Sequence, residues 1–581
     1  MSNVATALGD LRRSLSAARF PLPCPRADEG REAAVELAQQ IDDYLLPRYQ
    51  SLDAPLLAVV GGSTGAGKSL LVNSLVREHV ARSSAIRPTT RDPLLVHAVE
   101  DGTWFSSDRI LPGLARLSRS GHTRQDSPEA PPPASESSVG SLELVQSHAV
   151  PQGLALLDSP DIDSVVEANR RLAGQLLAAA DMWIFVTTAA RYSDAIPWKL
   201  LAESASRNIV LGVVVNRMPA GTHKEILPDL AKHLEEEGLG SVPVFTVTEY
   251  KDEDGLIPPA ELAPLQEWLL GLAASAASRS AVARQTLEGA TNALLLREPD
   301  VVDALEEQSG AALRMREAVA AAFAQSRGTV EASFEDGTLL RGEVLARWQE
   351  VVGTGEWMRK LESGVSSVRD RIAGWLRIQR QASSASAVDL AVEDSLLTSL
   401  VAASEGAIAN VELQWAANTE SAGAVEFAAL RLRSFEEREA DAAEAVRQWQ
   451  RDLVEMVSST GRDKKTTARL LAVGVNVVGA ALMVVIFAST AGLTGAELAV
   501  AGGTAVAAQR VLEAVFGDDA VRKMTNRARE DLLEKTVGFF EVDADALIAS
   551  VDQYRIDVDG PAKVAAAFAA VRDALRTEKW R

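Results

Sequence analysis

Cysteine is almost absent from this chain of 581 residues, and aromatic side chains make up only 5% of it. The single cysteine, Cys24, excludes an internal disulfide and fits a reducing cytoplasm. The sequence shows no set of four or more suitably spaced Cys or His residues, as a structural zinc site would need. The first 20 residues contain no continuous apolar core, so we expect no signal peptide. The chain is rich in Ala, Leu, Val, Glu and Arg, a composition that favours helices over strands.

A surplus of positive charge is missing as well. Lysine and arginine together number 59 against 80 aspartates and glutamates, which gives a formal net charge of -21. This balance argues against nucleic acid as a partner. It does not exclude a membrane, because a local basic cluster can bind an anionic surface on its own.

The segment from Pro55 to Ser74 reads as a buried strand, a glycine-rich turn and the start of a helix. Residues 62–69, GSTGAGKS, fit the phosphate-binding pattern G-x-x-x-x-G-K-S/T. Glycines let backbone N–H groups close around a polyphosphate, and the helix N-terminus adds a positive dipole end. Lys68 is expected to reach the β- and γ-phosphates, and Ser69 to bind Mg²⁺. We therefore predict a nucleoside triphosphate site made by Gly62, Ser63, Gly65, Ala66, Gly67, Lys68, Ser69 and Leu70.

Short apolar runs alternate with helical patterns from residue 51 to about residue 275. This alternation predicts an α/β P-loop domain with a mostly parallel sheet and helices on both faces. Residues 120–140 are rich in Pro, Ser and Glu and are predicted to be a disordered insert in that domain. The strand-like runs are LLAVV (56–60), LALLD (154–158), MWIFVTT (182–188), IVLGVVVN (209–216) and VPVFTVT (242–248).

Strand-like runs stop after about Ser275, and apolar residues then recur at helical spacing, as in Met315, Val319 and Phe323. This predicts a long all-α bundle or stalk. We divide the chain into N-terminal helices that pack on the bundle (1–50), the P-loop domain (51–275), the bundle or stalk (276–465), a hydrophobic hairpin (466–514) and C-terminal helices that return to the bundle (515–581).

The prediction of a hydrophobic hairpin is based mainly on the stretch from Leu470 to Ala491. This stretch contains no charged residue and is long enough to cross a bilayer as a helix. A weaker apolar run, Leu498 to Ala508, follows after a turn-like GLTG. The alternative is a buried helix pair in the core of the bundle. Both flanks are basic, which suits a membrane hairpin with both ends in the cytoplasm; the flanking residues are Arg462, Lys464, Lys465, Arg469, Arg522 and Lys523.

Further residues that are expected to contact the nucleotide or Mg²⁺ follow the phosphate-binding loop along the chain. Thr90, or alternatively Thr89, is expected to bind Mg²⁺ and the γ-phosphate. Asp158 ends a buried strand, where it would hold Mg²⁺ through water. Two later strand ends are expected to bind the base, through Asn216 and Arg217 and through Thr248. The predicted metal ligands are Ser69, Thr90 and Asp158.

Taken together, these segments resemble the dynamin-like and Era/TrmE-like branch of GTPases. The likeness rests on the GSTGAGKS loop with Asn73 behind it, the Pro-Thr-Thr-Arg-Asp segment at 88–92 and the turn that follows Asp158. A long helical region with a hydrophobic hairpin narrows the resemblance to bacterial dynamin-like proteins. The resemblance implies a GTP hydrolase that binds GTP or GDP with Mg²⁺. Lys68, Thr90 and Thr64 are then the candidate catalytic residues.

Three motifs depart from the pattern of that family. Asp161 replaces the Gly of an Asp-x-x-Gly motif, and its carboxylate would repel a phosphate. Pro219 replaces the Asp that reads guanine, which leaves ATP as an alternative to GTP. Thr64 and Gly65 replace a catalytic Gln-Ser, so no residue is assigned to activate water. We expect slow hydrolysis that self-association stimulates.

The leading hypothesis is a membrane-associated dynamin-like GTPase whose slow hydrolysis drives self-assembly and membrane binding or remodelling. The resemblance implies membrane lipids as partners, a homo-oligomer or a hetero-oligomer with another dynamin-like chain, no nucleic acid, and a place at the cytoplasmic face of the cell membrane. Some bacterial members act at the division septum, which makes the septum a candidate location. The alternatives are a nucleotide-dependent scaffold without significant hydrolysis and a soluble P-loop ATPase.

Overall fold

The computed structural model divides into two compact units, each described here by itself. Unit 1 comprises Met1–Phe20, Pro25–Glu307 and Asp559–Arg581, and unit 2 comprises Pro21–Cys24 and Gln308–Val558. The structure describes residues 3–81, 93–107, 109–119, 140–162, 167–192, 198, 201, 208–219, 221–249, 255–335, 368–460, 475–488, 508–510, 512–513 and 515–578. The predicted insert at 120–140 falls outside these ranges except for its last residue.

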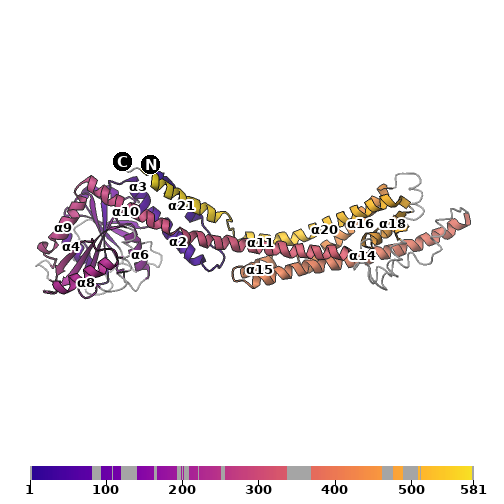
Figure 1. Cartoon of the computed structure of the whole chain (residues 1–581), viewed down its shortest axis with the longest axis horizontal. Coiled ribbons are helices and arrows are strands. Elements are labelled where there is room, and N and C mark those ends of the chain that lie inside the picture. Colours follow the sequence, from indigo (N-terminus) through magenta and orange to yellow (C-terminus); the bar gives the residue numbers. More distant parts are fainter. Residues whose placement is uncertain are drawn as a thin grey trace. The chain divides into compact units, whose positions relative to one another are not determined.

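Unit 1 contains a β-sheet with helices packed around it (Figure 1). The sheet has eight strands in the order β3-β4-β2-β5-β1-β6-β7-β8. All neighbouring strands are parallel except β2 and β5, which are antiparallel. The predicted α/β fold with a mostly parallel sheet is therefore confirmed. The strands are β1 (Leu56–Gly62), β2 (Leu94–His97), β3 (Ala115–Arg119), β4 (Ser141–Gln146), β5 (Leu154–Asp158), β6 (Met182–Thr188), β7 (Val210–Met218) and β8 (Val244–Thr248).

Helices cover both faces of this sheet, and β1 shows how. Leu56, Ala58 and Val60 alternate onto one face, where they share a core with α4 (Lys68–Val76) and α9 (Pro259–Ala273). The intervening residues face α6 (Glu167–Ala178): a Cβ at Gly61 would lie 3.2 Å from Leu177 Cδ2. Every residue of β1 is buried as a result, which explains its unbroken apolar sequence.

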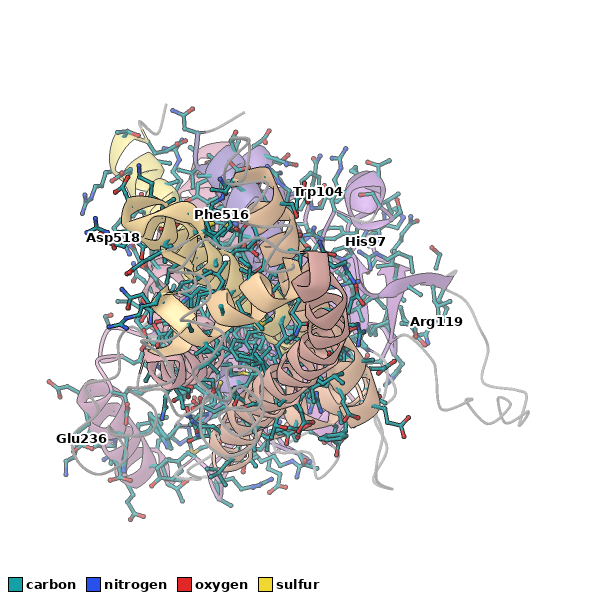
Figure 2. The ribbon with its side chains drawn as sticks, turned by 90° about the vertical axis from the view of Figure 1, so that its right-hand side faces the viewer. His97, Trp104, Arg119, Glu236, Phe516 and Asp518 are labelled. Atoms are coloured by element: carbon teal, nitrogen blue, oxygen red, sulfur yellow. The ribbon has the colours of Figure 1, made fainter. Side chains whose placement is uncertain are left out.

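The edge of the sheet at β3 was missed in the sequence because it has no apolar run. The β3 segment ARLSR is largely exposed, and Arg119 at its end pairs with Glu143 of β4 at 3.3 Å (Figure 2). Polar and charged side chains of this kind are typical of an edge strand. The buried strand β2 was also missed, because its four residues are too few to establish a period.

Helices from both ends of the described chain pack together in unit 1 (Figure 1). α1 (Asn3–Ala17) buries Leu8 and Leu11, and α21 (Gly560–Thr577) buries Val564 and Phe568. α1 also contacts α2 (Ala27–Gln40). The other short elements of unit 1 are η1 (Ile41–Leu45), α3 (Leu46–Gln50), η2 (Val99–Asp101), α5 (Gly102–Phe105), α8 (His223–Glu236) and α10 (Ala276–Leu296).

A buried ion pair ties these helices to the sheet. Arg48 of α3 pairs with Asp181, the residue before β6, and Asp181 also accepts a 2.7 Å hydrogen bond from Leu57 N of β1. Thr286 of α10 donates to the Asp181 carbonyl at 2.8 Å. Burial raises the pKa of Asp181, and the charge of Arg48 opposes that shift. Asp181 thus joins β1 and α3 through its carboxylate and α10 through its backbone carbonyl, at the start of β6.

Unit 2 is built from helices: the part of α11 (Glu298–Glu335) from Gln308 on, α14 (Val368–Ala416), α15 (Ala422–Ala429), α16 (Phe435–Thr460), α18 (Val475–Ala488) and α20 (Asp518–Asp552). The predicted apolar positions Met315, Val319 and Phe323 are buried, as are the large side chains of Trp415 and Trp449. Trp449 also donates its Nε1–H to the Ala528 carbonyl of α20 at 2.9 Å. These contacts fit the predicted helical bundle.

A second buried carboxylate, Asp543 of α20, lies in this bundle. Arg433 binds both of its oxygens, at 3.1 Å from Nε and 2.7 Å from Nη2, and Ser404 of α14 donates to it at 2.9 Å. The Arg433 guanidinium also lies 4.7 Å from the centre of the Phe539 ring. Asp543 is fully buried, and both of its oxygens are hydrogen-bonded.

The apolar helix α18 contacts α14, α16 and α20, and every residue from Val478 to Ile486 is buried. Its 14 residues would extend about 21 Å, less than the roughly 30 Å of a bilayer core. The rest of the predicted hairpin lies mostly outside the described residues. Among the described helices, Leu390–Ala416 in α14 has the length and composition to cross a membrane, a test that core helices also pass.

Candidate functional site

The phosphate-binding loop connects β1 to α4 and requires glycine at two positions. Gly62 and Gly67 have φ angles of 154° and 98°, which side chains rarely adopt. A Cβ at Gly62 would lie 2.1 Å from the Val186 carbonyl oxygen, and one at Gly67 would lie 2.3 Å from Asn216 Nδ2. The loop therefore packs directly against the ends of β6 and β7. The sequence pattern and the local geometry agree.

Lys68, the first residue of α4, is folded back into this loop. Its Nζ donates to the carbonyl oxygens of Gly62 at 3.0 Å and Ser63 at 3.3 Å, and it pairs with Asp161 Oδ1 at 2.5 Å. The Lys68 side chain is only 6% exposed, whereas that of Asp161 is 33% exposed. The sequence predicted that the Asp161 carboxylate would repel phosphate. In the structure Asp161 instead pairs with Lys68, the residue that is expected to bind phosphate. Their charges compensate each other.

Ser69 and Asp158 form the part of the site that would hold a divalent cation. Ser69 Oγ donates to Asp158 Oδ2 at 2.6 Å. The other oxygen, Asp158 Oδ1, is buried and has no hydrogen-bond partner among the described residues. Burial raises the pKa of Asp158 to about 6, while the Ser69 hydrogen bond and the Lys68 charge oppose the shift. A hydroxyl beside a carboxylate with a free oxygen fits Mg²⁺, which prefers oxygen ligands.

The residues predicted to bind the base lie at the same edge of the sheet. Asn216 at the end of β7 donates from Nδ2 to the Ala66 carbonyl at 2.8 Å, which fastens the phosphate loop to β7. Arg217 follows with a φ of 53° and is exposed. Thr248, at the end of β8, pairs in register with Met218. The Thr248 N–H donates to Glu261 Oε2 at 3.2 Å, a contact that the sequence did not indicate.

Of the predicted catalytic residues Thr64 and Thr90, the structure describes Thr64 but not Thr90. Thr64 lies at the tip of the loop, and its carbonyl accepts a 2.8 Å hydrogen bond from Arg191 Nη1. Arg191 follows β6 and was missed because a lone arginine in a turn carries no motif; only its place after a predicted strand could have pointed to it. Thr90, with its alternative Thr89, lies outside the described residues.

Residues 57–217 match the sequence model of the Dynamin family. No curated protein matches the chain. Two solved structures from work on an oligomerised bacterial dynamin pair, described as sensing and tethering membranes over long range, resemble the chain with TM-scores of 0.39. At 11% identity the first alignment covers 98% of this chain and 95% of the other; at 10% the second covers 96% of each. Toc33 from Arabidopsis thaliana, solved with Mg²⁺ and GMPPNP, has a TM-score of 0.21 and 14% identity over 48% of this chain and 96% of its own.

Proposed function

Residues 57–217 form a GTP-hydrolysing domain of the dynamin family, and from this premise we propose that the whole chain is a membrane-associated dynamin-like GTPase. Its ligands are GTP or GDP and Mg²⁺. When bound, Mg²⁺ neutralises charge on the β- and γ-phosphates. Ser69 and Asp158 are the described residues suited to hold the ion. Lys68 supplies the positive charge for the phosphates once Asp161 releases it.

The observation that carries the membrane proposal is the uncharged helix α18 in the same chain as this domain. The sequence from Leu470 to Ala491 has no charged residue, and α18 is its described part. A stretch of this length without charge is unusual for a core helix, and it is flanked by basic residues suited to anionic lipid. In the proposal α18 leaves its contacts with α14, α16 and α20 and enters the bilayer, at the cytoplasmic face of the cell membrane.

We further propose slow hydrolysis that self-association stimulates, in a homo-oligomer or with another dynamin-like chain. Thr64 and Gly65 occupy the loop positions where the family carries Gln-Ser, and neither side chain can orient water as glutamine does. The resulting cycle would drive self-assembly and membrane binding or remodelling, with the division septum as a candidate location. Pro219 in the guanine motif makes ATP the competitor to test against GTP.

The central experiment measures GTP and ATP hydrolysis with and without anionic liposomes, over a range of protein concentrations. We expect GTP to be preferred, and turnover per chain to rise with liposomes and with protein concentration. Equal turnover of both nucleotides would contradict the guanine preference. Turnover that ignores liposomes and protein concentration would contradict stimulation by assembly.

A crosslink tests the role of α18 directly. A Cβ at Gly479 would lie 4.0 Å from Val454 Cγ2 of α16, so Gly479→Cys with Val454→Cys should form a disulfide that locks α18 to α16. We expect the reduced protein to float with liposomes and the oxidised protein to stay at the bottom of the gradient. Each single cysteine variant is the control, because each adds only one thiol to the buried Cys24. Flotation of the oxidised protein would exclude α18 as the membrane element, and no flotation in either state would exclude membrane association.

The second candidate, a nucleotide-dependent scaffold, is favoured by the departures from the family motifs, above all Thr64 and Gly65 in place of the catalytic Gln-Ser. A scaffold would bind GTP without turnover, even with liposomes and at high protein concentration. The buried position of α18 similarly favours the alternative of a soluble P-loop protein, which the crosslink experiment distinguishes.

A further inference from the structure

Asp161 lies on a turn that is fixed to the end of β1. After Asp158, the Ser159 hydroxyl donates to the Val60 carbonyl at 2.9 Å, and the Ile162 N–H approaches the Gly62 carbonyl at 3.5 Å. These bonds lie on both sides of Asp161 and hold its backbone beside the phosphate loop. Buried neighbours therefore hold the backbone from which the Asp161 side chain extends, although that side chain is 33% exposed.

The Lys68 contact shows which end of the nucleotide this carboxylate faces. The lysine of a phosphate-binding loop reaches the β- and γ-phosphates. Asp161 Oδ1 lies 2.5 Å from Lys68 Nζ, so the carboxylate lies where the terminal phosphate must approach. When the γ-phosphate takes over Lys68, Asp161 loses its partner but stays on its fixed turn. Two negative groups at that distance repel each other unless a hydrogen-bond donor lies between them.

We propose that Asp161 is a catalytic residue for GTP hydrolysis, and that the donor between it and the γ-phosphate is the attacking water. The carboxylate orients this water and accepts its proton. The water oxygen forms a bond to Pγ, the bond from Pγ to the bridging oxygen breaks, and the electron pair goes to the β-phosphate of GDP. The proton then passes from Asp161 to the inorganic phosphate. A positioned base or water-orienting group is a regular part of such reactions.

The same residue has the opposite effect on binding. In the free protein Asp161 competes with the γ-phosphate for Lys68, so removing its charge makes binding easier while removing the group that acts on water. Lower turnover with tighter binding is a combination that damage to the fold does not produce. The inference rests on GTP hydrolysis by this domain and is independent of the membrane proposal.

The test compares Asp161→Asn with wild type by single-turnover hydrolysis and by titration with a non-hydrolysable GTP analogue. We expect the rate constant to fall by about 100-fold, the size of a typical acid–base contribution. We expect the affinity for the analogue to rise by about threefold to tenfold, because a neutral amide competes less well for Lys68. Asp161→Glu keeps the carboxylate and should retain more activity than Asp161→Asn. Glu143→Gln is the matched control, since Glu143 is equally exposed and also pairs with a cation, Arg119.

An unchanged rate in Asp161→Asn would overturn the proposal, even if binding tightened. Loss of rate together with loss of affinity would overturn it too, because that result indicates a structural role. No turnover in wild type under any condition would instead refute hydrolysis by the chain, and the catalytic role of Asp161 with it.

Discussion

Both units of the molecule contain buried aspartates, and two of them, Asp543 and Asp158, differ in what surrounds them. Asp543 in unit 2 has both oxygens bonded, to Arg433 and Ser404. Asp158 in unit 1 has one oxygen bonded to Ser69 and one buried without a partner among the described residues. A fully paired carboxylate stabilises one packing of its helices, whereas a half-paired one retains a site for a ligand. The number of paired oxygens therefore distinguishes Asp543, which stabilises the helix packing, from Asp158, which is suited to hold a ligand.

The largest expected effect comes from breaking the paired carboxylate. Asp543→Ala removes the buried partner of Arg433 and Arg438, which keep only the more exposed carboxylates of Asp441 and Glu405, and should lower the stability of unit 2 by about 3–5 kcal/mol. Asp158→Asn should cost far less without Mg²⁺, because Asp158 is only half paired. Hydrogen exchange, followed by mass spectrometry in peptides of α16 and α20, measures the change in unit 2. Equal protection in Asp543→Ala and wild type would remove the basis of the comparison.

The second-largest expected effect is the loss of nucleotide affinity when Lys68 is replaced. Lys68→Ala removes the cation that the loop folds around and should weaken nucleotide binding by at least about 100-fold, since charge-assisted contacts to phosphate are the strong ones. Titration with a fluorescent GTP analogue measures the affinity. Lys232→Ala is the control, because Lys232 is an exposed lysine that pairs with Glu236 on the surface of α8. Unchanged binding in Lys68→Ala would mean that the loop is not the phosphate site.

Asp43 provides a buried aspartate outside the phosphate loop with which Asp158 can be compared. It accepts a 2.7 Å hydrogen bond from Gln175. Burial raises its pKa from the ordinary 3.8 of an aspartate to about 6, so the folded state favours the protonated form. Its stabilising contribution is full below pH 3.8 and is lost as the pH rises through about 6. Between pH 4 and pH 7, wild type should therefore lose on the order of 2 kcal/mol that Asp43→Asn keeps. Urea unfolding of both proteins across this range measures the difference, and parallel curves would contradict the assignment.

The smallest expected effect is at the loop tip. Arg191→Ala removes the 2.8 Å hydrogen bond to the Thr64 carbonyl and should weaken binding of a GTP analogue by about threefold to fivefold, the worth of roughly one hydrogen bond. The Lys68 titration assay applies here as well. A loss as large as that of Lys68→Ala would indicate that Arg191 binds phosphate directly.

The sequence predicted the nucleotide edge better than anything else, and the reason is local. Gly62, Gly67 and Lys68 lie within seven consecutive residues, so one motif describes them. Asp158 and Asn216 could be placed because parallel strands deliver their carboxyl ends to one edge. β3 could not be predicted, because its exposed residues show no apolar run.

The buried ion pairs were beyond prediction for a different reason. Arg48 and Asp181 are 133 residues apart in sequence, and Arg433 and Asp543 are 110 apart. No local pattern marks such partners, since each residue alone reads as one more surface charge. The environment of α18 was undecided for a third reason: an uncharged helix has the same composition in a protein core and in a lipid bilayer.

The packing of α1 against α21 has a consequence for biosynthesis. α1 is made long before α21, yet the surface that covers Leu8 and Leu11 includes this later helix, whose residues begin at Gly560. During translation this apolar face of α1 must wait, exposed or held by a chaperone, until more than 500 further residues have been added. Unit 1 therefore cannot complete its fold on the ribosome before α21 has been made. A prematurely terminated product would expose this face, which quality-control proteases could recognise.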